Sequence, residues 1–282
     1  DMRLKDKVAI VVGAGQSPGE GVGNGRATAL TFAREGAKVL CVDHRLESAE
    51  ETVELIKQKQ GIGAAFKADV TRHADLKGMV ADAMKRWGRI DVLHNNVGVS
   101  IAGGDAELDK ITEEALDRCT AINLKSCILA CKEVIPIMRQ QGSGAIINIS
   151  SMAVLTTYPY VAYKATKAAM VAFTEQLAYQ NAQYGVRANV ILPGLMNTPM
   201  AVDTRAREFK KTRAEIELRR LKGHLTTCLH REPQDIGVAL GELSHKIENT
   251  DSVIAVVVKC QYDTSKDGKQ YRKEYLQKAL ST

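Results

Sequence analysis

The feature that most constrains the fold is an alternation of short apolar runs, rich in Val and Ile, with longer stretches of helical pattern. The runs are four to seven residues long, and most are continuously apolar rather than alternating. Strands that are covered by helices on both faces of a sheet have this pattern. We predict strands at residues 7–12, 38–42, 63–66, 90–95, 145–150, 187–192 and 252–258.

Helical patterns separate these strands. They lie at residues 24–35, 47–60, 72–87, 112–140, 161–183 and 233–247. Gly36 is typical of a helix end just before the next strand. The repeated strand–helix–strand order implies right-handed crossovers and an α/β fold, a doubly wound parallel sheet of about seven strands flanked by helices. Because there is no internal repeat or linker, we expect a single domain over residues 1–282.

The formal net charge is +6, and the basic excess falls in residues 201–231 and 259–282. Nucleic-acid binders combine such charge with a recognition motif or stacking aromatic side chains. Residues 201–231 contain one aromatic residue, Phe209, so we interpret them as a solvated helix face and expect no nucleic-acid partner. No apolar run is long enough to cross a bilayer and the start of the sequence lacks a signal-peptide core, so we expect no membrane partner.

The six cysteines include no Cys-x-x-Cys pair, which favours buried, reduced thiols and a cytoplasmic location. His224, Cys228 and His230 lie close together in the sequence. Their spacing matches no zinc pattern, and no fourth ligand is near. We therefore expect no metal site.

A glycine-rich stretch, residues 13–30, follows the first predicted strand and opens a helix. Glycines in this context let backbone amides approach a pyrophosphate at the start of the helix. Asp43, at the end of the second strand, would accept hydrogen bonds from an adenosine ribose and repel a 2′-phosphate, which favours NAD over NADP. Arg45 is close enough in sequence to bind that phosphate, so NADP remains possible.

Tyr163 and Lys167 stand four residues apart in a helical pattern and therefore share one helix face. A nearby ammonium would lower the pKa of the phenol and let it exchange a proton with an alcohol or carbonyl oxygen. The alternative is a snorkelling lysine beside a core tyrosine. The strand at 145–150 ends at Ser150 and Ser151, where a hydroxyl could hydrogen-bond the reacting oxygen.

These pieces resemble the short-chain dehydrogenase/reductase family of the Tyr-x-x-x-Lys type. The matching motifs, in the family's order over residues 5–200, are the glycine turn, ADV (68–70), HNNVG (94–98), INLKS (122–126), INISS (147–151), YKATK (163–167) and LPGLMNTPM (192–200). The resemblance implies an enzyme, an NAD(P)-dependent oxidoreductase that moves a hydride between NAD and a secondary alcohol or ketone. It also implies a homo-oligomer, a tetramer or a dimer.

The resemblance also implies roles for individual residues. Tyr163 would be the general acid/base, Lys167 would lower its pKa and hold the nicotinamide ribose, and Asn123 would support a proton relay. Ser151 would orient the substrate oxygen; strand register selects it, whereas the family's common spacing selects Ser150. The implied cofactor-binding residues are Gly13, Gly23, Asn24, Gly25, Asp43, Asp69, Val70, Asn96, Gly98, Tyr163, Lys167, Pro193, Gly194 and Thr198.

Two segments depart from the family pattern. Nine residues instead of three separate Gly13 from Gly23, which enlarges the phosphate loop and leaves open which glycines contact the cofactor. The last predicted strand lacks the family's Asp-Gly-Gly ending, so we expect an atypical tail at 259–282, a strand followed by a solvated amphipathic segment.

The residues that follow the site motifs predict the substrate. We expect the pocket to be lined by Ser100, Ile101, Ala153, Val154, Leu155, Tyr158, Tyr160, Leu195, Met196 and Met200. Most are apolar, which favours an alicyclic, aromatic or steroid-like alcohol under a lid at 199–224. The basic charge of the lid keeps an alternative open, an NADPH-dependent ketoreductase of carrier-bound 3-oxoacyl thioesters. A non-catalytic dinucleotide-binding regulator is a third interpretation.

Overall fold

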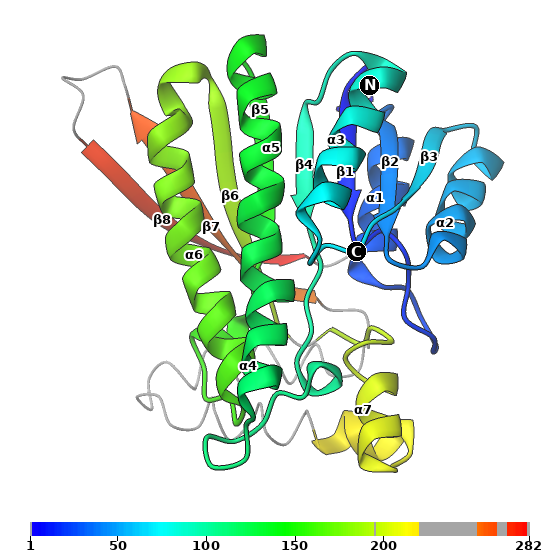
Figure 1. Cartoon of the computed structure of the whole chain (residues 1–282), viewed down its shortest axis with the longest axis vertical. Coiled ribbons are helices and arrows are strands. Elements are labelled where there is room, and N and C mark those ends of the chain that lie inside the picture. The colour runs from blue at the N-terminus through cyan, green and yellow to red at the C-terminus, as the bar shows by residue number, and fades with distance from the viewer. Residues whose placement is uncertain (1, 195, 220–252, 264–269, 281–282) are drawn as a thin grey trace.

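The computed structural model describes residues 2–194, 196–219, 253–263 and 270–280. In this part of the chain one sheet of eight strands runs in the order β3-β2-β1-β4-β5-β6-β7-β8 (Figure 1). The strands are β1 (Val8–Val12), β2 (Lys38–Asp43), β3 (Ile62–Lys67), β4 (Val92–Asn95), β5 (Gly144–Ile149), β6 (Val186–Pro193), β7 (Val253–Asp263) and β8 (Gln270–Leu280).

The first six strands are parallel, which confirms the predicted doubly wound sheet. Strand order reverses between β1 and β4, where Val12 lies beside Asn95. The loops that leave β1 and β4 therefore diverge to opposite faces of the sheet, which opens a crevice at their carboxyl ends. Ligands of this fold class bind in that crevice.

The strand expected at 252–258 is present as β7, but it runs antiparallel to β6, with Val190 opposite Val258. The tail also differs from the prediction, because β8 pairs with β7 from Val253 opposite Leu280 to Asp263 opposite Gln270. β7 and β8 are too close in sequence for a helical crossover, so they can pair only as an antiparallel hairpin.

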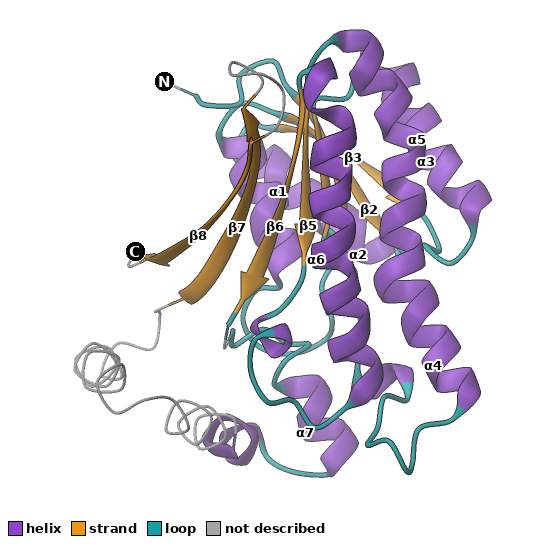
Figure 2. Cartoon of the chain, turned by 90° about the vertical axis from the view of Figure 1, so that its left-hand side faces the viewer, coloured by secondary structure: helices purple, strands orange, loops and turns teal. Residues whose placement is uncertain are grey.

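Helices cover both faces of the sheet, and one short helix lies beyond the carboxyl ends of its parallel strands (Figure 2). They are α1 (Asn24–Arg34), α2 (Leu46–Gln58), α3 (His73–Trp87), α4 (Glu113–Thr120), α5 (Ser126–Gln141), α6 (Val161–Asn181) and α7 (Asp203–Phe209). Alternate β1 side chains enter different cores: Ile10 packs with residues of α3, α5 and α6, whereas Val11 packs with residues of α1 and α2. Burial on both faces explains the continuous apolar runs of the strands. The helix expected at 233–247 lies outside the described residues.

The helix expected at 112–140 is interrupted. A π-helical turn, Ala121–Lys125, joins α4 to α5. The turn holds the side chain of Asn123 fully buried, facing the segment that follows β4. Such turns interrupt helices most often at functional sites. Short 3-10 turns lie at Ile101–Gly103, Met152–Val154 and Ala182–Tyr184.

Four cysteines in the described part of the chain are buried free thiols, as predicted: Cys41, Cys119, Cys127 and Cys131. Burial raises the pKa of Cys41 to about 12 and that of Cys119 to about 11, so these thiols are poor nucleophiles. The cluster of His224, Cys228 and His230 falls outside the described residues. No helix among those described has both the length and the hydropathy needed to cross a bilayer.

Candidate active site

The turn after β1 can hold a dinucleotide phosphate. Gly13 has a positive φ of 83°, and a Cβ on Gly25 would lie 1.8 Å from the Gly13 carbonyl oxygen. Only glycine therefore lets α1 begin so close to β1. Gly23, the N-cap, offers no side-chain hydrogen bond, and the first turn of α1, which begins at Asn24, has no acidic residue. The amides there are suited to an anion.

The enlarged glycine loop is ordered by Gln16. Its side chain accepts a hydrogen bond from the Gly23 amide and donates one to the Gly21 carbonyl, both at 3.0 Å. The tip of the loop faces α7, where Arg207 donates to the Pro18 carbonyl at 3.1 Å. The additional residues thus join the phosphate loop to the segment that was predicted to be a lid.

Charged side chains make a second contact between the loop and this segment. Arg213 pairs with Asp203 at 2.6 Å and lies 3.8 Å from Glu20 of the loop. A Cβ on Gly19 would be 2.3 Å from the carboxylate of Asp203. The loop tip therefore packs directly against the start of α7.

The end of β2 carries the predicted ribose-binding carboxylate. Asp43 accepts hydrogen bonds from the amides of Gly15 and Arg45, each at 3.1 Å. The guanidinium of Arg45 donates to the Gln16 carbonyl. A carboxylate and a guanidinium thus lie together at the end of β2, beside the glycine loop.

Asp69 lies beyond the end of β3 and accepts hydrogen bonds from the Thr71 amide and hydroxyl at 2.9 and 2.7 Å. These bonds to Thr71 lower the pKa of the Asp69 carboxyl, and the charges of Arg72 and His44 lower it further. The amide of Ala68, the residue before Asp69, donates to the Asp43 carbonyl at 3.0 Å, so Asp69 lies near the same end of the crevice.

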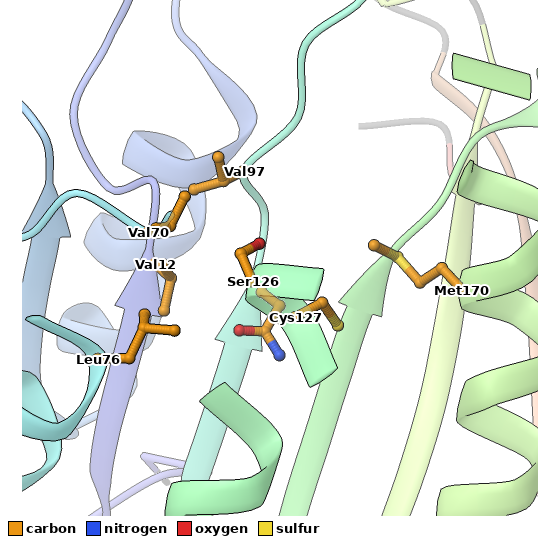
Figure 3. A pocket seen from close by; sticks show the side chains of 8 residues that line it. Val12, Val70, Leu76, Val97, Ser126, Cys127 and Met170 are labelled. Carbon is orange, nitrogen blue, oxygen red and sulfur yellow. The ribbon is translucent and has the colours of Figure 1, made fainter. Parts of the chain in front are cut away.

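A small cavity of about 10 Å³ lies among the ends of β1 and β4 and the start of α5 (Figure 3). Its lining residues are Val12, Val70, Leu76, Asn95, Val97, Ser126, Cys127 and Met170. This volume suits about one water molecule, so it is core space rather than a substrate pocket. Val70, one of the residues implied to bind the cofactor, therefore has at least part of its side chain turned to the core.

The floor of the crevice follows β4. Asn96 donates from its side chain to the Gly13 carbonyl at 3.3 Å, which ties this segment to the glycine turn. A Cβ on Gly98 would lie 3.1 Å from Nζ of Lys167 and 3.5 Å from Oδ1 of Asn123. Gly98 therefore lets these two side chains approach the floor together.

Tyr163 and Lys167 lie on one face of α6, with Nζ 5.9 Å from the centre of the tyrosine ring. Lys167 is 2% exposed, and its ammonium donates to the Ile149 carbonyl at the end of β5 at 2.6 Å. Burial lowers the pKa of Lys167 to about 8, against an opposing effect of Cys127. The ammonium is thus held beside the phenol, one helical turn along, at the carboxyl edge of the sheet.

The effect of Lys167 on the pKa of Tyr163 stays a prediction. Burial raises the pKa of the phenol above its usual value, while the Ser151 hydroxyl and, more weakly, the Arg205 charge lower it. The ammonium of Lys167 lies over the tyrosine ring and donates to the Ile149 carbonyl.

The two candidate serines face different partners. Ser151 accepts a hydrogen bond from the Ala153 amide at 3.2 Å, and its hydroxyl is close enough to Tyr163 to lower the pKa of the phenol. Ser150 is buried and donates to the Lys167 carbonyl at 2.8 Å. Ser151 therefore faces the phenol, whereas Ser150 is directed to the backbone of α6.

Asn123 connects the floor to α6. Its side chain exchanges two hydrogen bonds with the backbone of Val99, at 2.7 and 2.9 Å, and donates to the Thr166 hydroxyl at 3.1 Å. The amide thus fixes the segment after β4 against the helix that carries Tyr163. A relay to Lys167 is not part of these contacts.

Sequence reasoning missed Asp105. Its carboxylate accepts hydrogen bonds from the amides of Ala162 and Tyr163 at 2.9 and 3.0 Å, and from the Ser100 hydroxyl at 3.1 Å. Asp105 therefore caps the first turn of α6 and fixes the position of Tyr163 in that turn. The partners are 57 and 58 positions apart in sequence, so no local pattern could reveal them.

Arg205 of α7 was also missed. It donates to the Tyr158 hydroxyl at 3.3 Å and to the Ala201 carbonyl at 3.0 Å. Tyr158 in turn lies 3.0 Å from the Ser100 hydroxyl, and its ring centre is 5.4 Å from that of Tyr163. The basic excess of 201–231 was the available signal, but we interpreted it as a solvated face.

The other predicted pocket residues separate into groups. Tyr160 packs edge-on against Tyr158, Val154 packs against the core, and Leu155 and Met200 are 46% and 41% exposed. Leu195 lies outside the described residues. Ile101 and Ala153 lie in the short 3-10 turns on either side of the site, and Met196 follows β6.

The last three of the implied cofactor-binding residues lie at the end of β6 and in the segment that follows it. Pro193 is the last residue of β6, and Gly194 follows it directly. Thr198 is buried, and its hydroxyl accepts a hydrogen bond from the Ala201 amide at 3.2 Å. This segment leads into α7, so it borders the same carboxyl edge as Tyr163.

The sequence profile described as short chain dehydrogenase matches residues 7–208. The chain is 34% identical over 218 residues to the 3-oxoacyl-[acyl-carrier-protein] reductase FabG of Thermotoga maritima, covering 75% of this chain and 84% of that protein. It is 32% identical over 215 residues to the 3beta-hydroxysteroid dehydrogenase of Mediterraneibacter gnavus, covering 76% and 74%.

Among solved structures, the fold is similar to that of a 7α-hydroxysteroid dehydrogenase complexed with NADH and 7-oxo glycochenodeoxycholic acid. The TM-score is 0.61 and the sequence identity 30%, over 67% of this chain and 70% of that one. The chain is therefore a member of the short-chain dehydrogenase family, an oxidoreductase that uses a nicotinamide dinucleotide and acts on CH–OH groups.

Proposed function

We propose that the protein transfers a hydride between NAD and a secondary alcohol or ketone, with Tyr163 as general acid/base. The observation that carries the proposal is the position of this half-buried phenol. It lies between the Ser151 hydroxyl and the Lys167 ammonium, and the floor glycine Gly98 adjoins that ammonium. A proton donor, a hydrogen-bonding hydroxyl and a cation thereby meet at the edge of the sheet where dinucleotides bind.

The nicotinamide, when bound, accepts or donates the hydride, and the chain's own residues handle the proton. Tyr163 removes the hydroxyl proton during oxidation and returns it during ketone reduction. Ser151 hydrogen-bonds the same oxygen and holds it at the phenol. Lys167 supplies positive charge beside the phenol and a donor for the nicotinamide ribose, while Asn123 keeps the floor in register with α6.

We favour NAD over NADP because the Asp43 carboxylate lies at the end of β2 beside the glycine loop. A carboxylate there suits ribose hydroxyls and repels a 2′-phosphate. Arg45 supports the alternative, since its guanidinium lies on the same loop. Fluorescence titration with NADH and NADPH separates the two: tighter binding of NADPH would contradict the role given to Asp43.

We propose an alicyclic or steroid-like secondary alcohol as the substrate class. The ring of Tyr158 packs against that of Tyr163, and the ring of Tyr160 packs against that of Tyr158. A 3beta-hydroxysteroid dehydrogenase is among the relatives. The similarity to the 3-oxoacyl-[acyl-carrier-protein] reductase favours a second candidate, the reduction of 3-oxoacyl thioesters. A panel of cyclic alcohols, steroids and acyl thioesters, followed by nicotinamide absorbance, distinguishes them.

We also propose that residues 199–224, of which the structure describes 199–219, act as a substrate lid and that the protein is a homo-oligomer, a dimer or a tetramer. Contacts of α7 with the glycine loop and with Tyr158 support the lid. Light scattering of the purified protein tests the oligomer, and a monomeric mass would contradict it.

Tyr163→Phe tests the proton-transfer role. The variant keeps the ring and its packing, so it should bind NADH as the wild type does. Loss of the phenol oxygen should lower kcat by at least about 100-fold, the range for removal of a general acid/base. Turnover close to that of the wild type would exclude Tyr163 as the proton donor, whatever the substrate.

A further inference from the structure

We propose that Arg205 forms an anion-binding subsite in the substrate pocket, and that the alcohol or ketone this enzyme uses carries a carboxylate. The inference rests on the proposed function, because it concerns the substrate of the same site. It goes beyond that function by assigning a recognition role to a residue of α7, outside the Tyr163–Lys167 pair.

The position of Arg205 is the first step. Helix α7 lies beyond the carboxyl ends of the parallel strands (Figures 1 and 2). Arg205 points from this helix toward the tyrosines, since Nη2 is 3.3 Å from the Tyr158 hydroxyl. The rings of Tyr158 and Tyr163 are 5.4 Å apart, so the guanidinium lies one side chain away from the proposed reacting oxygen.

The charge of Arg205 is the second step. The guanidinium is half-buried, and its hydrogen bonds in the described part of the chain go to neutral acceptors, the Tyr158 hydroxyl and the Ala201 carbonyl. No carboxylate of the described residues forms an ion pair with it. Residues 201–219 contain five other arginines and lysines. Lys211 and Arg213 form ion pairs, and in the described part of the chain the basic side chain that donates to Tyr158 is Arg205.

The nearest acidic group on the same hydrogen-bond chain is Asp105, and it is already engaged. Both of its oxygens accept backbone amides at the start of α6, and one also accepts the Ser100 hydroxyl. Ser100 and Tyr158 separate it from Arg205. Asp105 therefore orders the tyrosines without neutralising the guanidinium.

A carboxylate is the ligand that this arrangement suits best. A partly desolvated cation without an anionic partner is unfavourable, and arginine binds carboxylates through a planar fork of donors. The neighbouring hydroxyl of Tyr158 offers a further donor to the same group. A cyclic or short-chain keto acid would thus place its ketone at Tyr163 and its carboxylate at Arg205.

The test compares two matched ketones, a ketocyclohexane carboxylate and its methyl ester, which differ in charge and little in shape. We expect wild-type kcat/KM to favour the carboxylate, and Arg205→Met to lower the carboxylate-to-ester ratio by about 10- to 100-fold, the range for loss of one charged hydrogen bond. Arg205→Lys keeps the charge without the fork, so it should lower the ratio only a few-fold.

Lys211→Met is the matched control, because it also removes one positive charge from the same segment. Its side chain is 44% exposed and pairs with Glu215 at 3.7 Å, away from Tyr158. The ratio should remain at its wild-type value in this variant. A fall equal to that of Arg205→Met would mean that net charge steers the substrate, and would overturn the subsite.

The remaining outcomes are also decisive. An unchanged ratio in both Arg205 variants, or equal losses on the acid and the ester, would overturn the proposal, since Arg205 would then act on the tyrosines alone. If neither ketone is turned over, the proposed function fails for this class, and titration of the carboxylate against the NADH-bound protein decides the subsite. Binding that Arg205→Met abolishes supports it; no binding overturns it.

Discussion

Lys167 gives the sharpest link between stability and the proposed chemistry. Its pKa falls from the usual 10.5 to about 8 because burial disfavours the ammonium. In that case the unfolded chain binds more protons than the folded chain between these two values, so stability rises with pH across the window. At pH 7 the protonated, buried lysine should destabilise the fold by about 3 kcal/mol relative to a group with no shift.

Replacing Lys167 with Met removes this destabilisation and leaves an unbranched side chain of similar length. The Ile149 carbonyl loses its donor in the variant, which costs about 1–3 kcal/mol and offsets part of the gain. That loss does not depend on pH, whereas the lysine contribution does. The free energy of unfolding of the wild type should therefore rise by about 2 kcal/mol relative to that of the variant between pH 7 and about pH 9.5.

Urea unfolding at these two pH values, followed by the fluorescence of Trp87, the single tryptophan, measures the difference. Lys164→Met, which removes a lysine from the same helix, is measured in parallel to subtract the effect of one lost charge. A constant difference between wild type and Lys167→Met at both pH values would refute the argument from burial. Turnover of the Met variant should fall steeply in either case, because the ammonium beside Tyr163 is gone.

Three further predictions concern single residues. Burial lowers the pKa of His94 to about 4 from 6.5. Unfolding experiments should therefore show up to about 3 kcal/mol of stability lost as pH falls through this window. His94→Gln should flatten this dependence of stability on pH, and an equal slope in the variant would contradict the argument. Ser151→Ala should raise the pKa of Tyr163, shift the pH–rate profile to higher pH and lower kcat by about 100-fold. Ser150→Ala should leave the profile in place, and the reverse result would select Ser150. In Gly25→Ala the new Cβ would lie 1.8 Å from the Gly13 carbonyl oxygen. The variant should bind NADH at least about 10-fold more weakly because the start of α1 is displaced. Unchanged binding in a titration would contradict the role of this loop in phosphate binding.

The sequence predicted those parts of the molecule that depend on local patterns. Continuous apolar runs predicted the parallel strands because both faces of the sheet are covered by helices. The four-residue spacing of Tyr163 and Lys167 predicted a shared helix face. Periodicity carries this information because it depends on backbone geometry alone.

Features that depend on tertiary contacts could not be predicted in this way. β7 pairs antiparallel with β6, which the apolar run itself does not encode, and the cap on α6 depends on Asp105, which the chain brings from a distant loop. Spacing places Lys167 beside the ring of Tyr163, but only the fold decides that the ammonium donates to the Ile149 carbonyl.

The basic segment after β6 illustrates why composition alone could not assign its role. Arg205 and Arg207 are two positions apart in α7, so their side chains leave the helix in nearly opposite directions. Arg205 contacts Tyr158 of the proposed substrate pocket, whereas Arg207 contacts Pro18 of the glycine loop. One short helix thus touches both halves of the site, and the enlarged glycine loop is what makes the second contact possible. A movement of α7 would change the cofactor side and the substrate side together, which a solvated helix face could not do.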